Sequence, residues 1–198
     1  NNAECSWIYN SGPDRRDRAI AVIAEFGPDI LSTQELEYNQ RLDFQHAFPE
    51  YGYYGLGRSG GIVGSANGIY YRTSRFDLVE SGDFWLSETP TVPGTTFQGN
   101  GSDTGNPRMA TWAKLFDHDT SQTYFVLSTH WSLDSAARTA SGALIQDMLP
   151  SLAGNLPILV LGDLNTTQGS TAYRTLRGQT DPNDVFLNDS FVEAGGIN

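Results

Sequence analysis

The 198-residue sequence predicts a mixed α/β domain built of stacked sheet and helix layers. Apolar segments with helical periodicity are separated by groups of short segments that alternate aromatic or β-branched residues with polar ones. Helices that alternate with groups of strands are typical of one domain in which helices pack on sheets. The length fits a single domain, for which roughly 150 residues is usual, and 38% hydrophobic residues are enough for a packed core.

The first part of the chain predicts a helix, a strand and a second helix. The first helix, DRRDRAIAVIAEF, follows Pro13 and ends before Gly27, a residue that is common just past a helix C-terminus. The apolar run at 30–35 comes directly after a Gly-Pro break and is typical of a buried strand. The second helix is expected at about 39–47, before Pro49.

The middle of the chain predicts mostly antiparallel strands. Residues 51–84 alternate aromatic or β-branched residues with polar ones, and glycines and short polar turns separate the segments. Residues 87–107 are rich in Thr, Pro, Gly and Asn, which predicts a long loop of the kind that is often functional. Two further strands are expected at 108–117 and 123–129, joined by a turn.

The last third of the chain predicts a helix at 136–149, capped by Asp134. One face of this helix is expected to carry Ala140, Leu144 and Met148. The most apolar stretch, 157–162, is interpreted as a central strand, 171–176 as a short helix and 184–195 as a weak strand.

Charge and composition restrict the classes of partner. The chain has 23 acidic and 12 basic residues, so its formal charge of −11 excludes a broad basic surface for nucleic acid. The single cysteine, Cys5, excludes an internal disulfide framework and a cysteine zinc cluster. The sequence contains no run of about 20 apolar residues and therefore predicts no transmembrane helix. The acidic balance and the use of one lysine, Lys114, against eleven arginines are compatible with a secreted protein.

Glu35 is the first candidate site residue, because it ends the predicted strand at 30–35. A carboxylate that leaves an apolar sheet at this point can bind a hard cation such as Mg²⁺, which prefers oxygen ligands. An ordinary surface glutamate is the alternative, and it is favoured when the residue is considered alone.

His130 is the second candidate, at the end of the apolar strand that includes 124–127. A histidine in this position can donate a hydrogen bond or a proton to a developing negative oxygen. The alternative is a histidine that bonds a nearby carbonyl. His46 and His118 lie in helix and turn contexts and are not distinguished in this way.

Asp163 and Asn165 are the third candidate pair, within Gly-Asp-Leu-Asn after the apolar stretch. If the chain stays extended, both side chains face one side and can serve as an acid/base group and a phosphate ligand. A turn is the alternative, since Gly, Asp and Asn all favour turns. Asn165-Thr-Thr also matches a weak glycosylation pattern, as do the triplets at 100–102 and 188–190, but the catalytic interpretation is preferred at Asn165.

Arg108 is the fourth candidate, where the long predicted loop enters the strand at 108–117. An arginine at such a junction can clamp a phosphate group through its planar fork of donors. An arginine that bonds loop carbonyls is an equally good interpretation.

Together, these motifs resemble the endonuclease/exonuclease/phosphatase superfamily of DNase-I-like metal-dependent phosphoesterases. Its hallmarks occur here in the family's order: Gln-Glu after Pro-Asp-Ile-Leu, Thr-His after a strand, and Gly-Asp-Leu-Asn after an apolar strand. The resemblance runs from about Arg15 to Asn165. The matching stretches are PDILSTQELE, NGIYYRTSRFDLVESGDFWLSETP, PRMATWAKLF, FVLSTHWSLDSAAR and PILVLGDLNTT.

The resemblance implies a four-layer α/β/β/α sandwich of two mainly antiparallel sheets, with the site at one end. It implies that Glu35 binds Mg²⁺ or Mn²⁺ and that His130 stabilises or protonates phosphoryl oxygens. Asp163 would orient or deprotonate the attacking water, Asn165 would hold a phosphate oxygen, and Arg108 would bind the substrate phosphate. A divalent ion offsets the negative charge, and hydrolysis proceeds by in-line attack of water.

The sequence also departs from the family pattern. The family's first strand with its asparagine and its final Ser-Asp-His segment have no counterpart here, so we expect residues 1–198 to form one domain that is incomplete at both ends. A glutamate that often precedes the strand of NGIYYR is Ser65 here, and the acidic residue after His130 is Asp134, at an altered spacing. A chain without these parts is expected to expose unpaired strand edges and to have little activity.

Two functions are compatible with these observations. The first is a metal-dependent phosphoester hydrolase acting on a nucleic acid, a phospholipid headgroup or a small phosphoester. The charge of −11 and the single lysine argue against a long polyanion. The second is a catalytically silent binding module on the same fold, which Ser65 and the altered spacing after His130 favour. The retention of Glu35, His130, Asp163 and Asn165 together favours the hydrolase.

Overall fold

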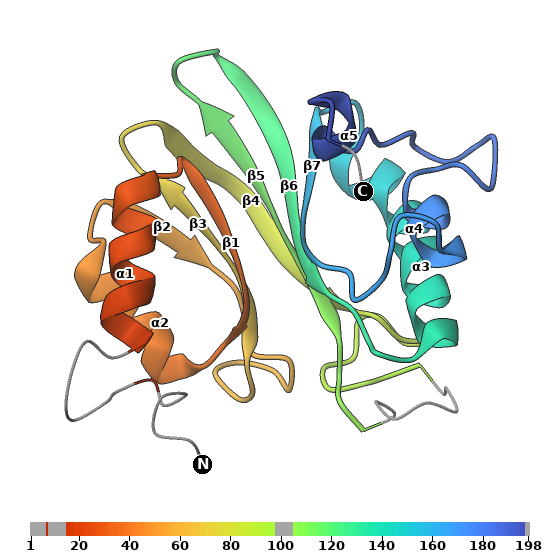
Figure 1. Cartoon of the computed structure of the whole chain (residues 1–198), viewed down its shortest axis with the longest axis horizontal. Helices are drawn as coiled ribbons and strands as arrows, with labels where there is room; N and C mark the ends of the chain where they lie inside the picture. Colours follow the sequence, from red (N-terminus) through yellow and green to blue (C-terminus); the bar gives the residue numbers. More distant parts are fainter. Residues whose placement is uncertain (1–6, 8–14, 98–104, 197–198) are drawn as a thin grey trace.

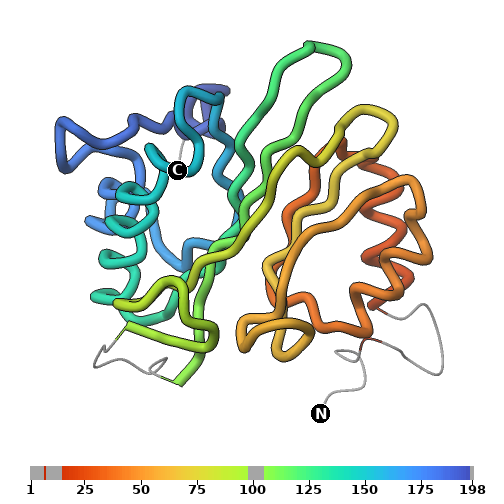
Figure 2. Tube along the Cα trace, turned by 180° about the vertical axis from the view of Figure 1, so that it is seen from behind, coloured from red at the N-terminus to blue at the C-terminus, as the bar shows by residue number. Residues whose placement is uncertain are grey.

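The computed structural model describes Trp7, residues 15–97 and residues 105–196. In this part of the chain, two sheets pack face to face and helices cover their outer faces (Figure 1). The reverse view shows the same layers, with the two helical layers on opposite sides of the paired sheets (Figure 2). The predicted four-layer α/β/β/α sandwich is therefore confirmed.

The first sheet has the strand order β1-β3-β2 and is wholly antiparallel. It consists of β1 (Ile30–Leu36), β3 (Ala66–Arg72) and β2 (Tyr51–Tyr54). Helices α1 (Arg15–Phe26) and α2 (Tyr38–Ala47) cover its outer face. The burial of apolar side chains between these elements stabilises the layer. The main contributors are Ile20, Ile23, Leu36, Phe44, Phe48 and Tyr70.

The second sheet has the order β4-β5-β6-β7. Strands β4 (Phe76–Trp85), β5 (Met109–Asp117) and β6 (Gln122–His130) are antiparallel neighbours. Strand β7 (Ile158–Asp163) pairs parallel with β6, and helix α3 (Ser135–Ala153) makes the crossover that such a parallel pair requires.

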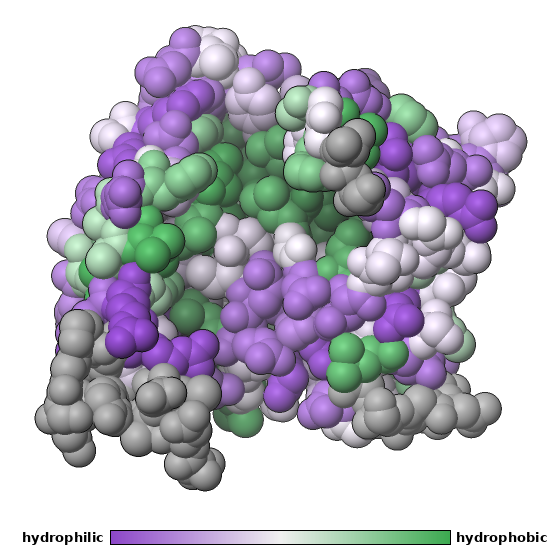
Figure 3. Space-filling model, viewed as in Figure 1, coloured by the Kyte–Doolittle hydropathy of each residue, from purple (hydrophilic) through white to green (hydrophobic). Residues whose placement is uncertain are grey.

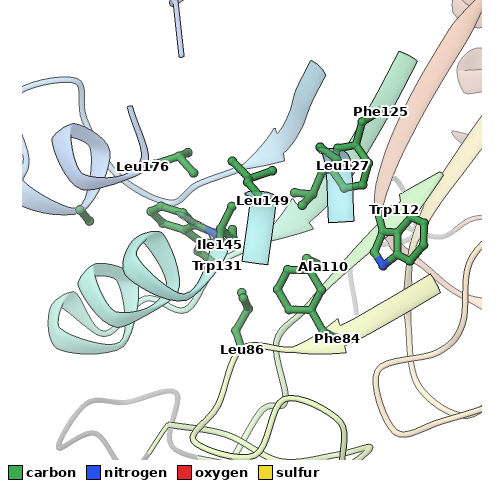
Figure 4. Packing of buried hydrophobic residues seen from close by; sticks show 12 residues of the cluster. Phe84, Leu86, Ala110, Trp112, Phe125, Leu127, Trp131, Ile145, Leu149 and Leu176 are labelled. Carbon is green, nitrogen blue, oxygen red and sulfur yellow. The ribbon is translucent and has the colours of Figure 1, made fainter. Parts of the chain in front are cut away.

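Helix α3 and the short helix α4 (Thr171–Leu176) cover the outer face of the second sheet. Figure 4 shows Trp131, Ile145 and Leu149 in one cluster with Ala110 of β5 and with Phe125 and Leu127 of β6. Asp134 caps α3, because its Oδ1 accepts a hydrogen bond of 2.8 Å from the backbone N–H of Ala137.

The buried face of α3 lies one position away from the predicted one. Buried positions recur every four residues at Ala137, Ser141, Ile145, Leu149 and Ala153, which is a helical stripe. The expected residues Ala140, Leu144 and Met148 lie beside this stripe and are only partly buried. The sequence pattern is ambiguous here because apolar residues occupy both stripes.

Polar bonds accompany the apolar contacts between the two sheets. Ile69 of the first sheet packs against Leu115 and Val126 of the second. Ser32 Oγ and Ser128 Oγ lie 2.7 Å apart, and Asn67 Nδ2 donates to the Met109 carbonyl at 2.9 Å. Such bonds satisfy polar groups that would otherwise be costly to bury.

Two expectations about the end of the chain are corrected. The stretch 184–195 contains no strand and ends in the single-turn helix α5 (Ser190–Glu193), because Asp189 Oδ1 accepts from the N–H groups of Phe191 and Val192. Strand β7 is not central, because within the described residues it forms an edge of its sheet. Its apolar character matches a groove that lies beside that edge.

This groove lies between α1, β1 and β7. Figure 3 shows apolar side chains gathered in a hollow in the middle of the face. In the described residues, β1 and β7 each have one neighbour only, so one edge of each strand is unpaired. The lining is mostly apolar: Val22, Ile23, Phe26, Pro28, Ile30, Leu31, Ser32, Gln34, Leu161 and Gly162.

Among the helices of the described residues, none has both the length and the apolar character that crossing a membrane requires.

An ion-pair cluster joins the two sheets at the end where β1 begins and β5 ends. Arg75 donates to both carboxylate oxygens of Asp117, at 3.0 and 2.9 Å, and to Asp29 Oδ2 at 2.6 Å. The Asp117 side chain is only 1% exposed. The guanidinium of Arg75 lowers the pKa of Asp117 to about 2 from its ordinary value of 3.8.

We predict that Asp117→Asn lowers the free energy of unfolding at pH 7 and flattens its acid dependence. Because the pKa of Asp117 is lower in the folded state, its contribution is complete above about pH 4 and is lost as the pH falls toward 2. Urea unfolding at pH 7 and pH 3 measures both effects. The matched control is Asp119→Asn at an exposed neighbour of Arg75. An Asp117 variant with wild-type stability and acid dependence would contradict the prediction.

Candidate active site

The structure brings three predicted residues together at the end of the sheets opposite the Arg75 cluster. His130 is the last residue of β6, and the parallel register pairs it with Asp163, the last residue of β7. His130 Nε2 lies 3.9 Å from Asp163 Oδ2, and His130 Nδ1 lies 3.9 Å from Glu35 Oε1. The imidazole therefore stands between two carboxylates.

Glu35 reaches this place through an irregularity in β1. The register between β1 and β3 shifts between Thr33 and Leu36, and Glu35 has a φ of +55°. This conformation is rare for a residue other than glycine, and it turns the side chain out of the pleat. About two thirds of the carboxylate side chain is exposed. The sheet-end position predicted for Glu35 is therefore correct, and its carboxylate is open to an ion or a substrate.

Asp163 and Asn165 lie in a turn, so the expectation that they alternate along an extended chain is wrong. Asp163 Oδ1 accepts a hydrogen bond of 2.8 Å from the backbone N–H of Asn165, and Asn165 has a φ of +48°. Asn165 Nδ2 donates to the Trp131 carbonyl at 2.9 Å, which ties the turn to the end of β6. The turn alternative is thus the right local conformation, and it holds both side chains beside His130.

Gly162 makes the approach of β7 to β6 possible. Its φ is +138°, and a Cβ atom at this position would lie 1.9 Å from the Thr129 carbonyl oxygen. Only glycine is compatible with both the dihedral angle and the close backbone contact. The backbone geometry at this place therefore requires glycine at position 162.

Arg108 lies at the same end of the molecule, at the start of β5. It lines a small recess together with His130 and two residues that the sequence analysis missed, Arg58 and Asn67. The remaining lining residues are Ser65, Pro107 and Met109. The signal for Asn67 was a polar residue inside an aromatic strand, whereas Arg58 lies in a glycine-rich turn that carries no pattern.

The electrostatic surroundings lower the pKa of His130. Burial is the main cause, and the positive charge of Arg108 adds to it, while the carboxylates of Asp163 and Glu35 oppose it. A lowered pKa keeps the imidazole neutral near pH 7, so one ring nitrogen can donate and the other can accept.

The oxygen donors suit a hard cation such as Mg²⁺ or Mn²⁺. Glu35 and Asp163 both present exposed carboxylates beside His130. No group of three His, Cys, Asp or Glu side chains in the described residues could hold a metal ion alone. Magnesium is commonly bound through one or two carboxylates, with waters and substrate phosphate completing its shell. An open carboxylate at Glu35 fits this mode of binding.

The family model of the Endonuclease/Exonuclease/phosphatase family matches residues 4–193. The chain belongs to this family. The resemblance seen in the sequence is thereby confirmed, and the family's motif residues are those that meet at His130. Asp134, whose spacing from His130 departs from the family pattern, is the cap of α3. No match is found among curated proteins.

Several solved structures are similar to this chain. The endonuclease/exonuclease/phosphatase from Bacteroides vulgatus is 32% identical with a TM-score of 0.78, over 84% of this chain and 63% of that one. A mannosyl-6-phosphatase from Bacteroides thetaiotaomicron is 34% identical with a TM-score of 0.74, over 82% and 60%. The chain thus spans less than two thirds of the length of either relative. The catalytic domain of human Nocturnin, at 18% identity and a TM-score of 0.67 over 89% and 65%, shares the fold.

We predict that the pKa of His130 lies below 6.5 and rises when Arg108 is replaced by Gln. The substitution removes a positive charge that opposes protonation of the imidazole. Titration of the histidine ring signals by NMR measures the change. Arg138→Gln is the control, because Arg138 of α3 donates to the carbonyl of Leu133, before the helix, and does not line the recess. An unchanged or lower pKa of His130 in Arg108→Gln would show that the two side chains are not electrostatically coupled.

We predict that Gly162→Ala lowers the free energy of unfolding by at least about 2 kcal/mol, because of backbone strain and the clash with Thr129. Gly169→Ala is the control, since nothing lies within 4 Å of a Cβ at Gly169, and its effect is expected to stay within about 0.5 kcal/mol. Urea unfolding measures both variants. Equal stabilities would show that the close approach of β7 to β6 is not a constraint.

Proposed function

We propose that the complete natural protein is a divalent-metal-dependent phosphoester hydrolase. The observation that carries the proposal is the meeting of Glu35, His130 and Asp163 within 3.9 Å contacts at one end of the sheets. Family membership supports a phosphoesterase type of reaction. The reaction is hydrolysis by water, which attacks phosphorus in line with the leaving oxygen.

Glu35 is the residue we assign to hold Mg²⁺ or Mn²⁺. When bound, such an ion offsets the negative charge of the site and polarises the phosphoryl group. This assignment agrees with the exposed carboxylate of Glu35 at the end of β1 and with the preference of hard cations for oxygen.

The other residues receive roles from their positions. Asp163 orients the attacking water and accepts its proton, because its carboxylate is exposed and lies next to His130. His130 donates to a phosphoryl oxygen from its neutral imidazole. Asn165 is fixed by its bond to the Trp131 carbonyl and contributes an amide to the phosphate, and Arg108 binds a phosphate oxygen.

A small phosphoester is the substrate class we favour. The formal charge of −11 and the single lysine disfavour a long polyanion such as nucleic acid. The similar structure from Bacteroides thetaiotaomicron is named a mannosyl-6-phosphatase, and a 6-phosphorylated sugar is a small phosphomonoester. A phospholipid headgroup remains the second candidate within the same chemistry.

The test compares the complete natural protein with its Asp163→Asn variant. We expect Mg²⁺- or Mn²⁺-dependent release of p-nitrophenol from p-nitrophenyl phosphate or bis(p-nitrophenyl) phosphate. We also expect a roughly 10²–10⁴-fold lower kcat/KM in the variant, the usual size of general acid–base catalysis. Asp147→Asn, at an exposed position of α3, is the matched control and should keep full activity.

Two results would contradict the proposal. Hydrolysis that persists in Asp163→Asn or that does not need a divalent ion would assign the activity elsewhere. Absence of hydrolysis of both esters, with phosphate binding retained, would favour the catalytically silent binding module instead.

A further inference from the structure

Strand β7 has the composition of a strand inside a sheet, although one of its edges is open. Residues 158–161 are all apolar, and a continuous apolar run is typical of a strand that is covered on both faces. In the described residues β7 pairs with β6 only. Leu159 is 41% exposed, while its neighbours Ile158 and Val160 pack against the core on the α3 side. The composition of β7 therefore predicts a cover that the described residues do not supply.

The backbone of β7 presents hydrogen-bonding groups along this open edge. The carbonyls of Pro157 and Asp163 accept backbone N–H groups of β6 and of the residue after it, so the odd-numbered residues of β7 face β6. Successive residues of a strand point their N–H and C=O groups in opposite directions. The backbone groups of Ile158 and Val160 therefore face the open edge, where they can pair with an added strand.

Hollows lie beside this edge on both faces of the sheet. On the face toward the first sheet, the groove between α1, β1 and β7, here called the inner groove, has a volume of about 390 Å³. A further hollow of about 340 Å³ shares Ile30 with it and reaches Leu159. On the opposite face, an outer hollow of about 180 Å³ lies between β7, α4 and α5. Because side chains alternate along a strand, a strand added to β7 would send them in turn into the hollows of the two faces. The apolar lining of the outer hollow includes Val160, Leu164, Leu176 and Leu187.

The shape and charge of these hollows favour one extended segment over a folded partner. The inner groove is hollowed beside α1 (Figure 3), and Val22 and Phe26 of its α1 wall are 65% and 83% exposed. A folded partner would have to bring a sheet edge past this wall, whereas a single strand needs little width. No charged residue lines the inner groove. A second copy of the chain would also bring together two formal charges of −11, which repel each other.

The similar structures contain chain that could supply such a segment. Only 63% and 60% of the two Bacteroides structures are covered by this chain, so each contains further residues without a counterpart here. Ser190 of α5 lines the outer hollow, so the last described residues lie beside the open edge of β7 (Figure 1). A segment that follows them would have a short path to this edge.

We propose that the open edge of β7 binds a further strand of the natural protein, from chain outside these 198 residues. This strand pairs with the backbone groups of Ile158 and Val160, and its own apolar side chains enter the hollows on both faces. It covers Leu159 and the open edge of the strand that carries Asp163. The proposal concerns the assembly of the sheets and does not depend on the proposed function.

The first experiment compares hydrogen exchange in the complete natural protein and in the 198-residue chain. We expect the Val160 amide to exchange at least about 100-fold more slowly in the complete protein, because a bonded strand amide exchanges only when its region opens. The Leu161 amide faces β6 and is the internal control, which should be slow in both proteins. NMR of proteins labelled at valine and leucine measures both amides.

The second experiment substitutes the exposed side chain at the open edge. Leu159→Lys should lower the thermal midpoint of the complete protein by about 5 °C or more, because the added strand buries the new charge. Val79→Lys is the matched control and should shift the midpoint by less than about 2 °C. Val79 is 61% exposed on β4, which forms the opposite edge of the same sheet. This comparison needs only the complete protein.

Three outcomes overturn the proposal. A Val160 amide that exchanges equally fast in both proteins would show that no strand pairs with this edge. Equal effects of Leu159→Lys and Val79→Lys in the complete protein would show that Leu159 stays uncovered. Protection of Val160 that appears in the 198-residue chain and increases with its concentration would assign the edge to a second copy of the chain.

Discussion

The close contact between β1 and β6 sets the geometry on which the site depends. Ser32 and Ser128 meet side chain to side chain at 2.7 Å, so the two sheets approach closely where larger residues would hold them apart. Glu35 follows Ser32 by three residues, and His130 follows Ser128 by two. The serine pair therefore joins the strands that carry Glu35 and His130, and the bond from Asn67 to the Met109 carbonyl joins the two sheets as well.

Irregular backbone at the strand ends orients the side chains of the candidate site. Glu35, Gly162 and Asn165 all have positive φ angles, and all three lie where a strand of the site ends. In residues other than glycine, here Glu35 and Asn165, such conformations cost free energy and persist where the surrounding structure determines them. Here the parallel pairing of β6 with β7 and the bond from Asn165 to the Trp131 carbonyl hold the backbone in this conformation. The strain turns side chains out of the sheets toward one common point.

Local patterns predicted most helices and strands, because burial imposes its periodicity on each element separately. They also predicted that Glu35, His130, Asp163 and Arg108 lie at the ends of strongly patterned strands, where the structure places them, while their roles stay predictions. The features that the sequence analysis missed have non-local causes. The helix α5 depends on capping by Asp189, and the edge position of β7 depends on which strands pair. Arg58 reaches the site through bonds made by Trp85, far away in the sequence, so no local pattern could reveal it.

His130 lies among charged groups of both signs, and this arrangement is compatible with the phosphate site that we propose in an acidic protein. Glu35 and Asp163 each lie beside one ring nitrogen of the imidazole, and Arg58 and Arg108 line the recess next to it. Burial and the arginines outweigh the carboxylates in their effect on His130, whose pKa is lowered overall. A bound ion would offset the carboxylates further and leave a net positive site. With arginines gathered in one recess, a chain with a formal charge of −11 could bind the anionic substrate that we propose without a basic surface.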